Sequence, residues 1–313
     1  MTKADAPKVT MIIISYNEKE YLPRAIDSCL KQTYANKEII IGDDGSNDGS
    51  IELIQTYEEQ GLRYFVMERN EERASIIPSL RVSNVIKRAM DLTDGDYYVI
   101  LSGDDYYIYD QMLTNAVEYL EGHPNYFSYV YGFQKVTDEE TLEVVRLPKC
   151  SPAVYYASAY NHVSCFVFRR LGSEELLDRF CDDTGLEFVL ATKGKWKWDD
   201  AIALAYYQRD ASIMHKADKT ELSVVEMMLF QDILNWKGRK SRQIMNAVYS
   251  RYYRPYRYLS EHLEYRDEKY QKYLKNAAKY PNNLFEQIPG KKGILLKMGI
   301  CHLGGRVARK LRL

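Results

Sequence analysis

The sequence predicts an α/β fold in which a mixed, mostly parallel sheet is flanked by helices. Over the first 135 residues, short apolar runs alternate with segments whose apolar residues recur at helical spacing. Most of the predicted strands end at glycine, aspartate or serine. Hydrophobic residues make up 46% and charged residues 28% of the chain, as in ordinary globular proteins.

The predicted elements are strand and helix in turn. Val9–Ser15 is an apolar, β-branched run, which is typical of a buried parallel strand. Residues 18–32 carry an apolar face at helical spacing. The same criteria predict strands at 38–41, 62–67, 97–101 and 126–136, and helices at 48–60, 78–92 and 110–121.

The second half of the chain is less regular. Residues 137–170 have the character of mixed strands and loops, and helices are predicted at 173–192 and 199–208. A helix at 221–236 opens a segment rich in tyrosine, arginine and lysine. We therefore divide the chain into an α/β domain, 1–218, and a C-terminal helical region with a basic amphipathic tail, 219–313.

Composition narrows the classes of function. A net charge of −1 in 313 residues gives no overall positive potential that would attract nucleic acid. Five scattered cysteines without a C-x-x-C pair indicate reduced thiols in a cytoplasmic protein and no zinc site. The chain has no secretory signal and no run of about 18 apolar residues that could span a membrane.

Two acidic turns carry the chemistry. Asp43-Asp44 follows the second predicted strand, and Asp104-Asp105 follows the fourth. Parallel strands end at one edge of a sheet, where ligands bind. A carboxylate there can accept hydrogen bonds from a base or a ribose, and an adjacent pair suits a divalent cation completed by phosphates. The alternative is that each is a polar turn, because Asp, Gly and Ser are common turn residues.

The glycine patterns of other nucleotide-binding folds are absent from the sequence. The chain has neither the Rossmann dinucleotide pattern nor the P-loop pattern. Nucleotide binding through carboxylates and a metal ion therefore fits the sequence better than binding by a glycine-rich loop.

The segment from Val9 to Ser50 resembles glycosyltransferase family 2. It contains I-I-I-S-Y-N-E-x-x-Y-L, S-C-L-K-Q-T-Y and K-E-I-I-I-G-D-D-G-S-N-D-G-S, and D-G-D-Y-Y-V-I-L-S-G-D-D-Y-Y follows at Asp94–Tyr107. The resemblance extends over residues 8 to 215. It implies a GT-A fold and an inverting transfer from a nucleotide diphosphate donor, typically a UDP- or dTDP-sugar, to a hydroxyl acceptor, with Mn²⁺ or Mg²⁺.

The resemblance also implies roles for individual residues. Asp104 and Asp105 stand at the family's metal site, where Ser102 replaces a further Asp that many members have. Arg81, on the helix before the fourth strand, is expected to reach the nucleotide. The implied nucleotide-binding residues are Ser15, Tyr16, Asp43, Asp44, Arg81 and Asp104.

The family places its catalytic base about 90 to 100 residues after the metal site, at the start of a helix, where one carboxylate takes the acceptor proton. Asp199-Asp200 matches the family's acidic pair in that position, at the start of the helix predicted at 199–208. Asp200 is the first choice for the base and Asp199 the second. The alternative is that the pair merely caps the helix, because Asp is a preferred N-cap residue.

Further residues are expected near the donor sugar and the diphosphate. His162 and Ser164 resemble a segment that borders the donor sugar in some members. His215, next to Lys216, stands where relatives place a basic residue near the diphosphate. The alternative for a single histidine is a structural hydrogen bond.

The tail at 291–313 has seven Lys or Arg residues and no acidic residue, interleaved with apolar side chains. Such a helix can lie on an anionic membrane surface. This predicts peripheral contact with the inner face of the membrane, which would suit a lipid-linked acceptor. The alternative is a packing or dimer helix, and the sequence leaves a homo-oligomer open.

The sequence thus favours a glycosyltransferase that builds a surface polysaccharide or similar glycan. A sugar-nucleotide pyrophosphorylase would need a glycine-rich basic loop after the first strand, where Ser15-Tyr16-Asn17-Glu18 stands instead. An inactive nucleotide-sugar-binding or scaffold protein is the remaining alternative. It is supported by Ser102, which stands where many family members have a further Asp at the metal site.

Overall fold

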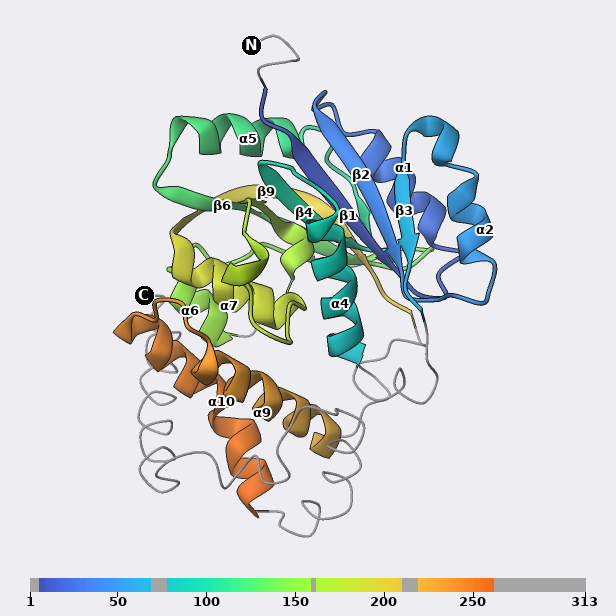
Figure 1. The fold of residues 1–313 in the computed structure, drawn as a ribbon. Coiled ribbons are helices and arrows are strands. Elements are labelled where there is room, and N and C mark those ends of the chain that lie inside the picture. Colours follow the sequence, from blue (N-terminus) through green and yellow to red (C-terminus); the bar gives the residue numbers. More distant parts are fainter. Residues whose placement is uncertain (1–5, 69–77, 159–161, 210–218, 262–313) are drawn as a thin grey trace.

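The computed structural model describes residues 6–68, 78–158, 162–209 and 219–261. In this part of the chain, one sheet has the strand order β3-β2-β1-β4-β8-β6-β9-β5, with β7 paired to β6. Helices flank the sheet, and α9 and α10 extend away from it (Figure 1). The predicted mixed, mostly parallel sheet with flanking helices is confirmed.

The N-terminal half is a parallel sheet whose strands are in near-matched register. Val9 at the start of β1 pairs with both Lys37 and Tyr97. The strand β1 is almost entirely buried, which requires cover on both faces of the sheet. The elements of this half are β1 (Val9–Ser15), α1 (Leu22–Leu30), β2 (Lys37–Asp43), α2 (Ser50–Gln55), β3 (Arg63–Val66), α4 (Pro78–Asp91) and β4 (Tyr97–Ser102).

The second half makes the sheet mixed. Strand β8 runs antiparallel to both of its neighbours, β4 and β6, whereas β6 and β9 are parallel. The elements are β5 (Tyr106–Tyr107), α5 (Met112–Gly122), β6 (Tyr126–Val136), β7 (Thr141–Val145), α6 (Pro152–Ser158), the 3-10 turn η2 (Val163–Cys165), β8 (Phe166–Arg169), α7 (Asp183–Lys193) and β9 (Lys195–Tyr207).

Two helix predictions in this half are wrong. Residues 199–208 were expected to be helical, but 199–207 belong to the long strand β9, which pairs with β6 on one side and β5 on the other. Its Trp, Ile and Tyr residues suit a strand, and pairing with residues far away in sequence outweighs the helical spacing. The helix predicted at 173–192 begins only at Asp183, after a single 3-10 turn.

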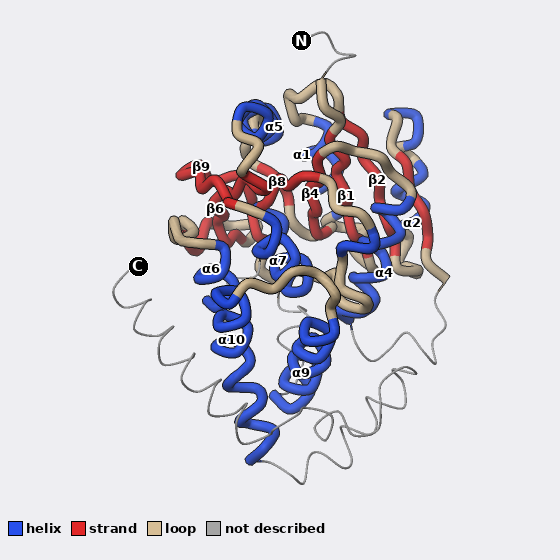
Figure 2. The backbone as a smooth tube through the Cα atoms, turned by 60° about the vertical axis from the view of Figure 1, so that its left-hand side comes forward, coloured by secondary structure: helices blue, strands red, loops and turns tan. Residues whose placement is uncertain are grey.

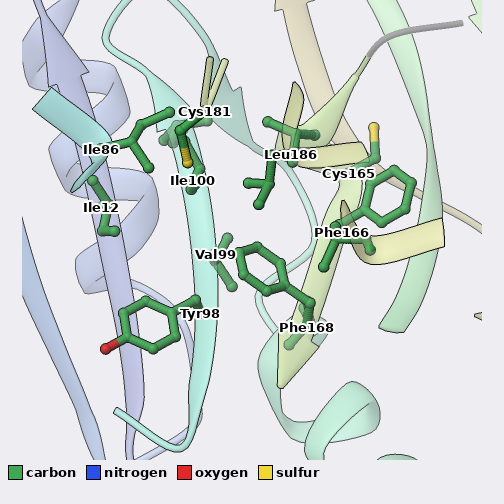
Figure 3. Close-up of a cluster of buried hydrophobic side chains, with 14 of the residues drawn as sticks. Ile12, Ile86, Tyr98, Val99, Ile100, Cys165, Phe166, Phe168, Cys181 and Leu186 are labelled. Atoms are coloured by element: carbon green, nitrogen blue, oxygen red, sulfur yellow. The ribbon is translucent and has the colours of Figure 1, made fainter. Parts of the chain in front are cut away.

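The core is continuous from the sheet into the C-terminal helices α9 (Lys219–Asn235) and α10 (Arg242–Glu261). Figure 3 shows side chains of β4, β8 and α7 meeting in it, among them Val99, Phe166 and Leu186. Helices α9 and α10 add Met227, Phe230, Ile233, Val248 and Tyr252. The described part of region 219–313 therefore shares one core with the α/β domain.

Two expectations drawn from composition concern features that the described residues can show. Among residues 6–68, 78–158, 162–209 and 219–261, no helix is long and apolar enough to cross a membrane. The four cysteines in these ranges are free thiols. The basic tail at 291–313 lies outside the described residues.

We predict that Gly42→Ala destabilises the protein by about 1–3 kcal/mol, the usual cost of overpacking a core. A Cβ at Gly42 would overlap the Val85 side chain and lie 2.7 Å from Cζ of Phe65. Urea unfolding measures the loss. Gly122→Ala is the matched control, because a Cβ there meets nothing within 4 Å. Equal free energies of unfolding for the two variants would contradict the predicted tight packing of α4 on β2.

Candidate functional site

One corner of the site lies where β1 and β2 end. The Arg81 side chain on α4 places Nε 2.8 Å from Oδ2 of Asp44. Its guanidinium carbon is 4.8 Å from the ring centre of Tyr16. An aromatic ring, a guanidinium plane and a carboxylate thus lie together. The two planar groups can stack on a base, and the carboxylate can accept hydrogen bonds from a ribose. The structure brings together these three sequence-predicted residues, which we call the base corner.

Ser15 and Asp43 lie beneath the base corner, with side chains fully buried. Asp43 accepts hydrogen bonds from the backbone N–H and the hydroxyl of Ser46, both at 2.7 Å. Ser15 contributes its backbone carbonyl, which accepts a hydrogen bond from the Asp44 N–H at 2.9 Å. In this arrangement the two residues shape the turn that presents Asp44, and neither side chain reaches the surface.

The two carboxylates that follow β4 have different environments. Asp105 is 2% exposed, and its Oδ1 accepts a hydrogen bond from the Tyr207 N–H at 3.0 Å. Burial, followed by the charge of Asp104, raises the pKa of Asp105 well above its usual range. Asp104 accepts a hydrogen bond from the Ser102 hydroxyl at 2.7 Å and remains partly accessible. Asp105 therefore anchors β9, and Asp104 is the carboxylate available to a ligand.

A cation already lies beside Asp104. Arg209, just after β9, places Nε 3.0 Å from Oδ2 of Asp104 and Nη2 2.9 Å from Oε1 of Glu18. Burial and the charge of Asp104 raise the pKa of Glu18, while Arg209 opposes that shift. Gly103 makes room for this arrangement, because a Cβ there would overlap Oε2 of Glu18.

The residues around Asp104 fit a divalent cation only in part. Two carboxylates, Glu18 and Asp104, flank one cationic position, and hard divalent cations prefer oxygen ligands. Within the described ranges, no group of three or more His, Cys, Asp or Glu side chains is arranged to hold a metal. A metal bound at Asp104 would therefore need oxygens from the substrate, as Mg²⁺ commonly does with phosphates.

A second acidic pair, which the sequence analysis missed, begins helix α7. Asp182 is the N-cap residue and accepts a hydrogen bond from the Gly185 N–H at 3.1 Å. Asp183 is reached by solvent and accepts a hydrogen bond from the Val163 N–H. The surrounding protein and the charge of Asp182 raise the pKa of Asp183 above its usual range.

Asp183 lies beside η2, because its carboxylate accepts a hydrogen bond from the Val163 N–H, and η2 connects it to the acidic loop after β4. The two regions are joined by a hydrogen bond from the Tyr107 hydroxyl in β5 to the Ser164 carbonyl in η2, at 3.1 Å. An accessible carboxyl with a raised pKa, connected through η2 to the candidate donor site, has the properties of a general base.

The structure does not bring Asp199 and Asp200 to the acidic loop. Asp199 accepts hydrogen bonds from the Tyr129 hydroxyl and from the Ala201 N–H. Asp200 pairs with Lys149 at 2.7 Å, and its side chain is 71% exposed. Tyr207, which binds Asp105, lies at the end of β9, about 23 Å from Asp200 at the usual rise of a strand. Asp44 and Asp104 thus follow two strands that end at one edge of the sheet, whereas Asp200 pairs with Lys149 elsewhere on β9.

The sequence does carry a signal for a helix start at Asp182-Asp183, but the helix predicted at 173–192 placed this pair in its interior. Asp182 is an N-cap residue followed by an apolar helix, which is a recognised start signal. The helix predicted at 173–192 ran across it. Glu18 belongs to the S-Y-N-E motif, but its contact with Arg209, 191 positions later, has no local signal in the sequence.

The donor-sugar candidates lie mostly inside the protein. His162 packs between Phe133 and Tyr206, with ring centres at 4.3 and 4.4 Å. Burial lowers the pKa of His162 to about 4, so the imidazole is neutral at pH 7. Ser164 is buried, and its carbonyl accepts the Tyr107 hydrogen bond described above. His215 lies outside the described residues.

The base corner and Asp104 lie at the carboxyl edge of a mostly parallel α/β sheet, which is the edge at which such sheets bind ligands. Residues 10–177 match the family model for glycosyl transferase family 2. The chain belongs to glycosyltransferase family 2.

Three curated bacterial relatives illustrate this membership. Protein CgeD of Bacillus subtilis is 30% identical over 169 residues, which are 52% of this chain and 38% of CgeD. Glycosyltransferase GlyA of Streptococcus pneumoniae is 28% identical over 51% of this chain and 21% of its own length. Glycosyltransferase GlyG, also of S. pneumoniae, is 25% identical over 66% of this chain and 72% of GlyG. The match with the first two therefore spans well under half of each relative.

Solved structures share the fold over nearly the whole chain. S. aureus TarS 1–349 in complex with UDP-GlcNAc has a TM-score of 0.60 and 14% identity, covering 97% of this chain and 92% of TarS 1–349. The mannosyltransferase PcManGT of Pyrobaculum calidifontis, in complex with GDP-Man and Mn²⁺, has a TM-score of 0.52 and 16% identity, covering 96% and 88%. The predicted GT-A fold is confirmed by this similarity.

A buried glutamate supports the segment next to α7. Glu187 is fully buried on α7, and its carboxylate accepts a hydrogen bond from the His162 N–H at 2.9 Å. Burial raises the pKa of Glu187 to about 8. Between its ordinary pKa near 4.5 and about 8, the folded protein binds more protons than the unfolded chain. The contribution of Glu187 to folding therefore falls as the pH rises through this window.

We predict that Glu187→Gln reduces the loss of stability between pH 5 and pH 8. The amide cannot ionise, and its carbonyl oxygen can still accept the His162 hydrogen bond. Thermal unfolding of both proteins across this range measures the difference in slope. Glu174→Gln, which changes a residue outside the core on the turn before α7, is the control. An unchanged slope in Glu187→Gln would contradict the raised pKa.

Proposed function

We propose that the protein is an inverting glycosyltransferase that moves a sugar from a nucleotide diphosphate donor, a UDP-sugar, to a hydroxyl acceptor with the help of Mn²⁺ or Mg²⁺. The observation that carries the proposal is the position of the base corner and Asp104 at one edge of the sheet, with the accessible Asp183 carboxyl beside η2, which is hydrogen-bonded to β5. Membership of glycosyltransferase family 2 supports the reaction class.

The donor would bind with its base against Tyr16 and Arg81 and its ribose near Asp44. The ion pair between Arg81 and Asp44 holds both side chains in place before the donor binds. Less conformational entropy is therefore lost when the donor binds. The fold shared with TarS bound to UDP-GlcNAc and with PcManGT bound to GDP-Man supports a sugar nucleotide in this role.

The diphosphate would lie near Asp104. Asp104 would hold the divalent cation, and Asp105 would keep the loop attached to β9 through Tyr207. The metal, when bound, would neutralise charge on the leaving diphosphate. Glu18 and Arg209 would line the same position, since they already flank Asp104.

Asp183 would act as the general base. It would take the proton of the acceptor hydroxyl while that oxygen attacks the anomeric carbon from the side opposite the diphosphate. The bond between the anomeric carbon and the diphosphate oxygen would break in the same step. A raised pKa makes the carboxylate of Asp183 a stronger proton acceptor than an ordinary aspartate. Asp200, with Asp199 as second choice, remains the competing assignment from the sequence.

The acceptor and its location remain predictions from the sequence. The sequence predicts a glycan or lipid-linked acceptor, synthesis of a surface polysaccharide and peripheral contact with the inner face of the membrane. The predicted membrane contact depends on the basic tail at residues 291–313. Residues 291–313 lie outside the described residues. The division into a catalytic domain, 1–218, and a C-terminal region, 219–313, is likewise part of the proposal.

We predict that Asp183→Asn lowers kcat by about 10²- to 10⁴-fold, the usual contribution of a general base. Binding of the UDP-sugar should be unchanged, because the substitution leaves the base corner intact. Release of UDP from a panel of UDP-sugars with Mn²⁺ measures turnover, and calorimetry measures binding. Asp200→Asn and Asp199→Asn are matched controls with the same chemical change. Full activity in Asp183→Asn together with loss in Asp200→Asn would transfer the role to Asp200.

We predict that Asp44→Asn and Arg81→Met each weaken UDP binding by roughly tenfold, about 1.4 kcal/mol. Each variant removes one partner of the ion pair that orders the base corner. The thermal shift produced by UDP reports the affinity through RT ln(1 + [L]/Kd). Arg63→Met is the control, since Arg63 pairs with Glu38 at 3.4 Å away from this corner. Unchanged shifts in both variants would remove the base corner from the donor site.

A further inference from the structure

A buried arginine connects the C-terminal helix α10 to the first turn of α7. The Arg251 side chain is 3% exposed, and its Nη2 donates to the hydroxyl oxygen of Thr184 at 3.2 Å. Its Nη1 donates to the carbonyl oxygen of Tyr156 on α6 at 3.0 Å. The guanidinium carbon lies 4.9 Å from the Tyr156 ring centre and 6.0 Å from that of Tyr252. One side chain therefore contacts three helices.

The charge of Arg251 lies near three acids, the buried Glu187 and the partly exposed Glu226 and Asp182. Glu226 on α9 lies 4.0 Å from Nη2, and Arg251 opposes the raised pKa of Glu226, Glu187 and Asp182. A buried cation that is removed from such a cluster leaves the acids without compensation, which is far more costly than loss of a surface charge. Arg251 thus stabilises the acidic side of α7 as well as its backbone geometry.

Thr184, which Arg251 contacts, is the residue next to Asp183. Asp183 itself is held by the Val163 N–H, and Asp182 caps the helix through the Gly185 N–H. The first turn of α7 is therefore fixed by the cap on one side and by Arg251 on the other. Helix α10 lies next to α6 and beneath α7 in both views (Figures 1 and 2).

We infer that Arg251 is a positioning residue for the reaction: from α10 it fixes the first turn of α7 and thereby the direction of the Asp183 carboxylate. The inference rests on the proposed role of Asp183 as base. It makes the C-terminal helices part of the catalytic unit, although they supply no group that touches the substrate. An arginine is suited to this role because its planar fork can donate to two fixed acceptors while it stacks on an aromatic ring.

The test compares Arg251→Met, Arg251→Lys and Thr184→Val in the full chain. We expect Arg251→Met to lower kcat for UDP release at least tenfold, with KM for the UDP-sugar within about twofold, because the base corner is untouched. Arg251→Lys should recover part of kcat by restoring the charge without the fork. Thr184→Val should lower kcat in the same direction, because it removes the hydroxyl that Arg251 holds.

Arg254→Met is the matched control, because it changes an exposed arginine on the same helix and should behave as wild type. Thermal unfolding and the UDP-induced thermal shift report whether each variant is folded with an intact donor site. If Arg251→Met does not fold, Thr184→Val carries the test. A folded Arg251→Met with wild-type kcat, or with a loss confined to KM, overturns the inference.

The double variant Asp183→Asn/Arg251→Met separates this inference from the proposed function. If Arg251 acts through Asp183, Arg251→Met has little further effect once Asp183 is replaced. An equal loss of kcat in both backgrounds overturns the positioning role and leaves the base assignment intact. Full activity of Asp183→Asn alone rejects the base assignment, and with it the inference that depends on it.

Discussion

The backbone of β1 ties the two acidic turns to one edge of the sheet, and the donor side of the site depends on this. The Ser15 carbonyl accepts a hydrogen bond from the Asp44 N–H, and the Ile14 carbonyl accepts one from the Gly103 N–H at 2.8 Å. Because β1 lies between β2 and β4 in parallel register, residues about 60 positions apart in sequence come to one edge. Because β1 is almost entirely buried, this alignment of the strands is rigid.

Four pairs of adjacent aspartates in the chain share one arrangement, in which the two carboxylates differ in exposure to solvent. In each pair the less accessible carboxylate accepts a hydrogen bond from a backbone N–H and shapes the chain, and among the more accessible neighbours Asp183 also accepts one. The shaping members are Asp43, Asp105, Asp182 and Asp199, and the accessible members are Asp44, Asp104, Asp183 and Asp200. A buried carboxylate avoids a large desolvation cost by accepting such hydrogen bonds. The pairing thus combines a rigid turn with a more accessible carboxylate, and three of these, Asp44, Asp104 and Asp200, form ion pairs.

Most strands and helices of the first 136 residues follow from local pattern, because each buried strand and each amphipathic helix carries its own periodicity. The strand predicted at 126–136 matches β6 at both ends, and the helix predicted at 78–92 ends one residue late. The failure at 199–208 arose because β9 is stabilised by pairing with β6 and β5, which lie far away in sequence. Its alanines and leucine give a local pattern that also suits a helix.

The sequence by itself determined the mostly parallel sheet, the acidic turns at its carboxyl edge and the resemblance to glycosyltransferase family 2, because all of these depend on short, contiguous patterns. Only the tertiary structure decided which acidic pair lies near those turns. Asp182-Asp183 and Asp199-Asp200 read alike along the chain, but the former begins a helix beside η2 and the latter lies far along β9. The contact of Arg251 with Thr184 was equally beyond the sequence, since it joins positions 67 residues apart through the packing of three helices.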